Sequence, residues 1–231
     1  PEILRYVIAR TKIKKHIDFD TGPSLFETAD EYERLVSNPP EDKELSKKKK
    51  VARDTALGAL RLSQVKRGDN ASLSTAGVSF RHLAMLAQIK SEDKDIWESL
   101  NRSQHLDGEP NQVLINRLAR MRNWIDSRHF PKDARINIQE IISEENKEKI
   151  NNQQEEFLTL LSSKLEKIEW NEKEISESIR LVSSEINIIR REAYVALYIL
   201  ILGSEYGPRI ASIMDEIGKE ATLNILSKSF Q

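Results

Sequence analysis

The amino-acid sequence predicts a mostly α-helical protein. Composition is the first reason, because 6% of the 231 residues are aromatic, 32% are charged, and only 8 are glycine and 7 proline. That balance favours long solvated helices over sheets with many tight turns. The second reason is periodicity, since apolar residues recur at helical spacing along most of the chain. A hydrophobic content of 39% is enough for a core at this length.

Composition also limits the class of protein. The absence of cysteine excludes disulfides, cysteine metal ligands and thiol nucleophiles, and it fits a reducing, cytoplasmic compartment. The longest apolar run is Tyr194–Leu202, far short of the roughly 20 residues that span a bilayer, and residues 1–15 lack the order of a signal peptide. We therefore expect a cytoplasmic protein with no membrane association.

The net charge of −1 hides an asymmetry along the chain. When the chain is divided after Glu140, the first part has a charge of +4 and the remainder −5. Such a division suits a protein that touches a polyanion with part of its surface. A charge of +4 over 140 residues does not by itself establish nucleic-acid binding.

The first helix is predicted over residues 1–10, with one apolar face made of Ile3, Leu4, Val7 and Ile8. A helix that begins at residue 1 suggests a piece of a longer polypeptide, although processing or numbering can also explain it. The alternation in residues 16–20 predicts a short extended segment, which residues 21–23 (Thr-Gly-Pro) end.

The second helix is predicted to begin with a capping box made by Ser24 and Glu27, and residues 38–40 (Asn-Pro-Pro) should stop it. One long helix is then expected from Glu41, through the four lysines of residues 47–50. These lysines can neutralise phosphates, but a lysine run on a helix is most often a solvated face.

A loop at residues 68–77 should separate this helix from two more, over residues 80–87 and around 96–100. The next predicted helix, Asn111–Arg128, is strongly amphipathic. Its apolar face contains Leu114, Ile115, Leu118, Met121, Trp124 and Ile125, and its arginines Arg117, Arg120 and Arg128 lie elsewhere. The conformation of residues 135–138 stays open. The polar segment 143–156 either links two bundles or forms an exposed helix.

Helices are predicted from about Gln154 to Ile168, from a cap at Asn171 with Glu174 through Val182, and over Arg190–Leu202, before a last pair that ends at Phe230. We find no internal repeat.

The turn at residues 203–209 should hold a ligand or form a plain helix corner. Gly203 can take φ > 0 at the helix end, and Pro208 should restart a helix as its first residue. Backbone N–H groups would then face outward beside Arg209 and the Tyr206 ring. A base or a phosphate can dock on such groups, whereas the plain alternative is a corner with a solvated arginine.

No catalytic or metal site is predicted. The four histidines, His16, His82, His105 and His129, are scattered, and no phosphate-binding loop or nucleophile elbow occurs. Asp18 and Asp20 are interpreted as ion-pair partners of the nearby basic residues.

Nucleic-acid binding is the positive hypothesis from the residues alone. Arginines and aromatic rings together can hold phosphates and stack unpaired bases. The candidate arginines are Arg117, Arg120, Arg128, Arg190, Arg191 and Arg209, and the candidate rings are Phe80, Trp124 and Tyr206. For Phe80 and Trp124 burial is the default, because both lie on apolar helical faces.

Several strings resemble a known family in the same order along the chain. They are residues 1–12 (PEILRYVIARTK), 16–20 (HIDFD), 31–35 (EYERL), 62–64 (LSQ), 80–83 (FRHL), Trp170 with 174–175, 196–198 (ALY), and 202–203 with 207–209 (GPR). Together they resemble the region downstream of the catalytic domain in class I lysyl-tRNA synthetases of the archaeal type. The ARTK and HIDFD strings point to the lysine enzyme over its glutamyl relatives. The resemblance covers essentially the whole chain.

The resemblance implies a piece of an enzyme without its catalytic centre. The family joins a nucleotide-binding catalytic domain to a stem-contacting connector and an α-helical cage that grips the anticodon. This chain resembles only the connector and the cage, so we expect a stem-contact connector at 1–38, a helical bundle at 39–145 and an anticodon-binding cage at 146–231. No cofactor is expected in this chain, since ATP and Mg²⁺ would bind the absent catalytic domain, and the chain alone should be inactive.

The expected partners are a lysine tRNA and a catalytic domain in cis, with no DNA and no membrane, and a monomeric chain. The expected tRNA-binding residues are Lys12, Lys14, Lys15, Arg117, Arg120, Arg190, Arg191, Tyr206, Gly207, Pro208 and Arg209. By resemblance, the corner at 207–209 lies near the last anticodon bases. No role carries over to Lys47–Lys50 or to the polar segment 143–156, where this chain departs from the family pattern.

Three alternatives stay open. They are a helical protein–protein interaction scaffold, the equivalent region of a glutamyl-type synthetase, and a small active enzyme. A scaffold would bind its partner without the salt dependence that phosphate contacts impose, and an enzyme would need a polar pocket.

Overall fold

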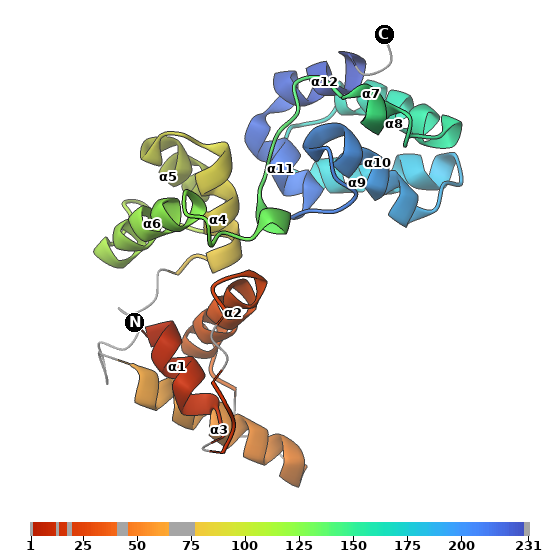
Figure 1. Ribbon diagram of the computed structural model, residues 1–231. Helices are drawn as coiled ribbons and strands as arrows, with labels where there is room; N and C mark the ends of the chain where they lie inside the picture. The colour runs from red at the N-terminus through yellow and green to blue at the C-terminus, as the bar shows by residue number, and fades with distance from the viewer. Residues whose placement is uncertain (1, 13, 18–19, 41–45, 65–76, 229–231) are drawn as a thin grey trace. The chain divides into compact units, whose positions relative to one another are not determined.

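The computed structural model describes residues 2–12, 14–17, 20–40, 46–64 and 77–228 (Figure 1). Within these ranges every regular element is a helix, which confirms the mostly α class. The chain divides into two compact units, Pro1–Lys132 and Asp133–Gln231. The three-part division at residues 38 and 145 stays a prediction, and so does the cage architecture.

The first unit contains six α-helices in its described part. They are α1 (Glu2–Arg10), α2 (Pro23–Ser37), α3 (Lys47–Ser63), α4 (Phe80–Ile89), α5 (Asp93–Arg102) and α6 (Gln112–Ile125). A short 3₁₀ turn, η2 (Lys132–Ala134), follows them.

Helices α1, α2 and α3 share a small core centred on two tyrosines. Tyr6 and Tyr32 are both buried and meet edge to face, with ring centroids 5.8 Å apart. The hydroxyl of Tyr6 donates to Glu31 at 2.7 Å, and burial, followed by this bond, raises the pKa of Tyr6 to about 12. The ring therefore satisfies its polar end inside the core.

The predicted apolar face of α1 is partly wrong. Leu4 and Ile8 are 43% and 49% exposed, whereas Tyr6 and Val7 are buried and Ile3 packs against the same core. The true face is rotated about the helix, because the large Tyr6 ring buries more apolar area than Leu4 and finds a partner for its hydroxyl.

Helix α2 starts one residue before the predicted cap. Gly22 is the residue before the helix, and Pro23 is its first residue, the position at which proline loses no hydrogen bond. The carboxylate of Asp20 accepts from the Gly22 N–H at 2.8 Å and from the Ser24 hydroxyl at 3.0 Å, and the Gly22 bond is the main cause of the lowered pKa of Asp20. The Ser24–Glu27 capping box is therefore wrong, and Asp20 holds the start of α2.

Two other N-terminal predictions need correction. The described residues His16, Ile17 and Asp20 belong to no strand, and residues 18–19 of the predicted extended segment lie outside the described residues. Helix α3 begins at Lys47, after a non-helical Ser46, so the long helix does not run unbroken from Glu41. Residues 41–45 and most of the predicted loop at 68–77 also lie outside the described residues.

An aromatic cluster joins α2, α4 and α6. It contains Phe26, Phe80, Trp124 and Phe130, with ring centroids 5.1 Å apart for Phe26–Trp124 and 4.8 Å apart for Trp124–Phe130. Burial of Phe80 is thus confirmed, and Trp124 is half-buried with its indole N–H donating to the Thr21 carbonyl at 3.2 Å. Helix α6 begins at Gln112, with Asn111 as its cap, and ends at Ile125, so it is shorter than the predicted Asn111–Arg128.

The second unit contains α7 (Glu144–Lys147), α8 (Asn152–Leu165), α9 (Glu172–Glu185), α10 (Arg190–Leu202), α11 (Ile210–Ile217) and α12 (Lys219–Lys228). Helix α10 contacts each of the other five, as expected for a helix that is apolar nearly all round. Its bounds match the prediction, and most of its residues are buried. The Asn171 cap is confirmed, since its side chain accepts from the Glu174 N–H at 2.9 Å.

The polar segment 143–156 is not simply an exposed helix or a linker. It forms α7 and the start of α8, and two of its polar side chains, Asn146 and Gln154, are buried. Gln154 completes a capping box with Asn151 and donates to the carbonyl of Glu192 at 3.0 Å. Hydrogen bonding permits this burial of amide groups.

The turn after α10 confirms one prediction and corrects another. Gly203 ends α10 with φ = +67°, in the left-handed region. Pro208, however, is not the first residue of the next helix, which begins at Ile210. The Pro208 carbonyl accepts from the Tyr198 hydroxyl at 2.9 Å, and the first carbonyl to receive helical N–H groups is that of Arg209.

In the described part of the chain, no helix is long and apolar enough to cross a membrane.

Candidate nucleic-acid interface

A groove of about 690 Å³ in the second unit brings predicted site residues together. The first half of α9 forms one wall, and the starts of α10 and α11 supply the rest. Its lining residues are Glu172, Lys173, Glu174, Ser176, Glu177 and Arg180 from α9, Arg190 and Tyr194 from α10, and Arg209 and Ala211 at the start of α11.

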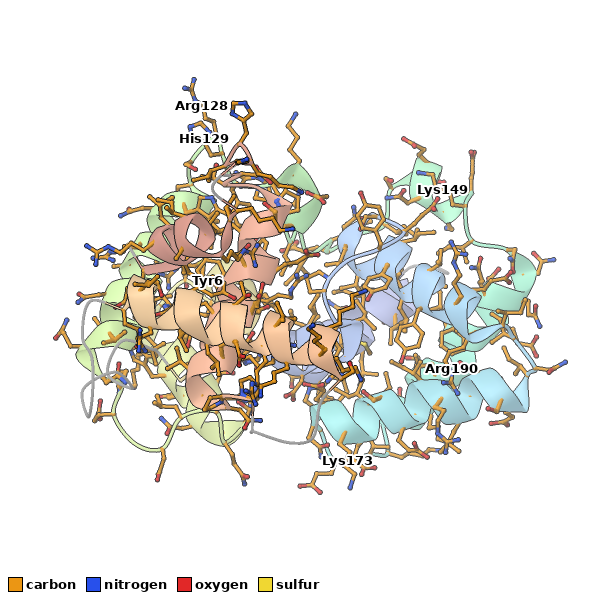
Figure 2. The ribbon with its side chains drawn as sticks, turned by 90° about the horizontal axis from the view of Figure 1, so that it is seen from below. Tyr6, Arg128, His129, Lys149, Lys173 and Arg190 are labelled. Carbon is orange, nitrogen blue, oxygen red and sulfur yellow. The ribbon has the colours of Figure 1, made fainter. Side chains whose placement is uncertain are left out.

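Arg190 and Tyr194 lie one helical turn apart and therefore share one face of α10. Both residues line the groove, whereas Ala193, Ala196 and Leu197 of the same helix are buried. Arg190 is exposed and Tyr194 is half-buried. Figure 2 labels Arg190 and, on α9, Lys173, which also lines the groove.

Tyr198 lies one turn after Tyr194, on the same face of α10. Its hydroxyl donates to the Pro208 carbonyl, and this bond ties the 203–209 turn to α10. Burial raises the pKa of Tyr198, and the neighbouring Tyr194 raises it further. The phenol therefore stays neutral at ordinary pH and keeps its proton for this bond.

Arg209 projects into the groove from the residue before α11. Its side chain is 76% exposed, and its Nη1 lies 2.7 Å from Oε1 of Glu172. Because both groups face water, the pair contributes little to stability and can exchange its carboxylate for another anion.

A second ion pair crosses one turn of α9. Arg180 donates from Nε to Glu177 at 2.9 Å, and its hydrogen bonds are the main cause of the lowered pKa of Glu177. Arg190, by contrast, is in no ion pair with any described residue. Of the cations in the groove lining, Lys173 and Arg190 are in no ion pair with a described residue, whereas Arg180 and Arg209 are each paired with a partly exposed carboxylate.

The other predicted residues of this unit lie outside the groove lining. Arg191 is exposed next to Arg190, and the Tyr206 ring is 63% exposed. Gly207 passes close to α10, where an added Cβ would lie 2.7 Å from Leu202 Cδ1 and 3.3 Å from the Tyr198 ring. Gly207 and Pro208 thus set the path of the turn.

The predicted residues of the first unit divide into two kinds. Lys12, Lys14, Lys15 and Arg120 are exposed. Arg117 differs, because its guanidinium pairs with Glu33 of α2, and their side chains are only 14% and 9% exposed. Arg117 therefore joins α6 to α2, an arrangement in which its charge is already neutralised.

Sequence reasoning missed three groove residues, Tyr194, Lys173 and Arg180. Tyr194 was assigned to the buried run of α10, although its spacing of four from Arg190 was a usable signal. Lys173 and Arg180 gave no signal, since charged residues on a helix most often face solvent.

The chemistry available in the groove is the binding of an anion beside an aromatic ring. Guanidinium groups form directed hydrogen bonds with phosphate, and a tyrosine ring can stack an unpaired base. Among the described residues, no cluster of three or more histidine, aspartate or glutamate side chains has a geometry that could hold a metal ion.

Known proteins resemble this chain in the region that contains the groove. A family model described as "Anticodon binding domain" matches residues 112–229, about half of the chain and the whole of the groove. The chain is also similar to lysine–tRNA ligases along nearly all of its length.

Three archaeal ligases illustrate this similarity. The ligase of Thermoplasma volcanium is 26% identical over 223 residues, which cover 96% of this chain and 41% of the relative. The ligase of Methanocaldococcus jannaschii is 27% identical over 235 residues, which cover 95% of this chain and 42% of the relative. The ligase of Archaeoglobus fulgidus is 28% identical over 222 residues, which cover 95% of this chain and 39% of the relative. The chain thus spans about 40% of the length of these relatives.

Proposed function

Because this chain belongs to the anticodon-binding-domain family, we propose that it binds a lysine tRNA and recognises its anticodon loop through the groove of the second unit. The lysine tRNA is chosen because the similar proteins named above are lysine–tRNA ligases. The groove carries the proposal, since it joins Arg190, Arg209 and Tyr194 inside the matched region.

An unpaired loop base would stack on the Tyr194 ring, while guanidinium groups hold the adjoining phosphates or a base edge. Arg190 is available without the loss of an ion pair, so it would make the first contact. Arg209 would exchange Glu172 for an RNA group at little cost, because the pair faces water.

Other exposed residues would extend this contact. Lys12, Lys14, Lys15, Arg120 and Arg191 would meet phosphates, and the exposed ring of Tyr206 would stack a base. Arg117 is left out of this surface, because its charge is neutralised by Glu33.

The proposed role is to position lysine tRNA for ATP-dependent aminoacylation by a catalytic domain joined in cis. The share of the relatives that this chain spans supports that division of labour. Binding of ATP and Mg²⁺ belongs, in this proposal, to the catalytic domain.

Arg190→Ala should weaken binding of lysine tRNA about 5- to 150-fold, the range expected for loss of a directed contact of about 1–3 kcal/mol. Lys167→Ala is the control, since it removes one positive charge from an exposed position of the same unit that lies outside the groove lining. It should weaken binding much less. Filter binding at fixed salt measures both variants. Equal losses in the two variants would count against the groove and favour a general effect of charge.

Arg209→Ala and Glu172→Gln should change tRNA affinity in opposite directions. The first removes a guanidinium, and the second frees that guanidinium from its carboxylate, so Glu172→Gln should bind more tightly. Both variants are assayed with lysine tRNA and with an anticodon-swapped tRNA, and circular dichroism checks the fold. Loss of discrimination in Arg209→Ala indicates base reading, whereas equal weakening of both tRNAs indicates phosphate binding. If neither variant changes affinity, Arg209 is only part of a helix corner.

A further inference from the structure

The four lysines at the start of α3 form a surface that the proposed groove does not use. We propose that Lys47–Lys50, here called the lysine turn, bind the phosphate backbone of the same tRNA as a second contact surface. This inference rests on the proposed function, and it assigns a role to a segment that lies outside the groove.

The lysine turn lies on the surface of the described part of the chain. All four lysines are exposed, and the following residue, Val51, is 60% exposed. Burial begins only in the second half of α3, where Ala59, Leu60 and Ser63 pack into the first unit. Figure 1 shows one end of α3 extending past α1 and α2.

Charge is concentrated on α3. The helix carries six cations, Lys47–Lys50, Arg53 and Arg61, against the single anion Asp54, so its net charge is +5 in a chain of net charge −1. Four successive residues are each turned by about 100° around a helix, so the lysines surround the turn on most sides. Within the described ranges, none of the four forms an ion pair.

Helix stability does not explain this arrangement. The amino end of a helix carries a partial positive charge, so each cation in the first turn is unfavourable. The side chain of Ser46 makes no capping bond that would compensate. The four lysines therefore destabilise the start of α3. Their charge favours binding to a negatively charged partner.

An RNA backbone is that partner in this protein. Lysine is a flexible point charge that meets phosphates without reading sequence, and no aromatic side chain lies in α3 to stack a base. Lys12, Lys14 and Lys15 follow α1, which packs along α3, and they add exposed cations to the same three-helix part of the first unit. The lysine turn should therefore supply affinity for the tRNA, and the groove should supply discrimination between anticodons.

The test replaces all four lysines with glutamine and measures tRNA affinity over a range of salt. Each lost phosphate contact lowers the slope of log affinity against log salt by about 0.7–0.9. We expect the slope to fall by at least about 1 and by no more than about 4, and affinity at 0.1 M salt to fall about tenfold or more. The ratio of affinities for lysine tRNA and its anticodon-swapped form should stay unchanged.

Two controls separate a contact from a general loss of charge. Replacement of the four lysines with arginine keeps the charge and should keep the slope. Replacement of Lys94, Lys132, Lys147 and Lys167, which lie outside α3 and outside the groove, with glutamine removes the same charge from scattered positions and should change the slope little. Circular dichroism should show that helicity is retained in every variant.

A wild-type slope in the lysine-turn variant, or an equal decrease in the scattered control, would overturn the inference. If the wild-type chain discriminates anticodons but does not depend on the lysine turn, only this inference fails and an acidic protein becomes the better partner for α3. If the wild-type chain binds no tRNA, the proposed function fails with it.

Discussion

Glu33→Ala should destabilise the first unit by about 3–5 kcal/mol, because it leaves the guanidinium of Arg117 in a nearly dry site without its carboxylate. The two side chains join helices α2 and α6, and they are only 9% and 14% exposed. Urea unfolding followed by circular dichroism measures the change in the free energy of unfolding.

Two further variants test whether the unpaired charge of Arg117 causes this loss of stability. Glu98→Ala removes a carboxylate from the exposed Lys94–Glu98 pair of α5 and should cost less than about 1 kcal/mol. The double variant Glu33→Leu/Arg117→Met removes both charges and should recover most of the stability. If Glu33→Ala is as stable as Glu98→Ala, the buried pair does not hold the helices together.

The double variant also tests the role of Arg117 in RNA binding. A structural role predicts that the folded double variant binds tRNA as tightly as the wild type. A loss of affinity at unchanged stability would return Arg117 to the proposed tRNA surface.

Gly203→Ala should lower the stability of the second unit by about 2–3 kcal/mol. An alanine in the left-handed region costs roughly 1–2 kcal/mol, and here its Cβ would also overlap the amide of Gln139. For a chain of this length the thermal midpoint should fall by about 4–12 °C. Differential scanning calorimetry measures the midpoint.

Two further variants separate these causes. Gln139→Ala removes the amide that the added Cβ would meet, so Gly203→Ala in that background should show the backbone cost alone. Gly58 lies in α3 with open space around it, and Gly58→Ala should stabilise α3 by about 0.5–1 kcal/mol. If Gly203→Ala loses as much stability in the Gln139→Ala background as in the wild type, the contact with Gln139 carries no cost.

Gly203 also matters to the groove. The turn that follows it leads to Arg209, and Tyr198 ties that turn to α10 through the Pro208 carbonyl. A distorted turn would therefore move Arg209 relative to Arg190, so tRNA binding by Gly203→Ala should fall together with stability.

Local patterns predicted the features that depend on neighbouring residues. The bounds of α10, the Asn171 cap and the left-handed Gly203 were all predicted correctly. Each depends on interactions within a few residues, such as the 2.9 Å bond from the Glu174 N–H to Asn171.

The sequence by itself determined the helical class, most helix positions, and the grouping of arginines with aromatic residues near the carboxyl end. Only the tertiary structure decided which of these charges are available to a ligand. Arg117 meets Glu33 across 84 residues, and Arg209 meets Glu172 across 37. The groove itself arises where three helices meet, so that Tyr194 and Arg209 line the same groove. Helical periodicity reports which side of one helix is apolar, but partners distant in the chain are set by how the helices pack together, and no local pattern contains that information.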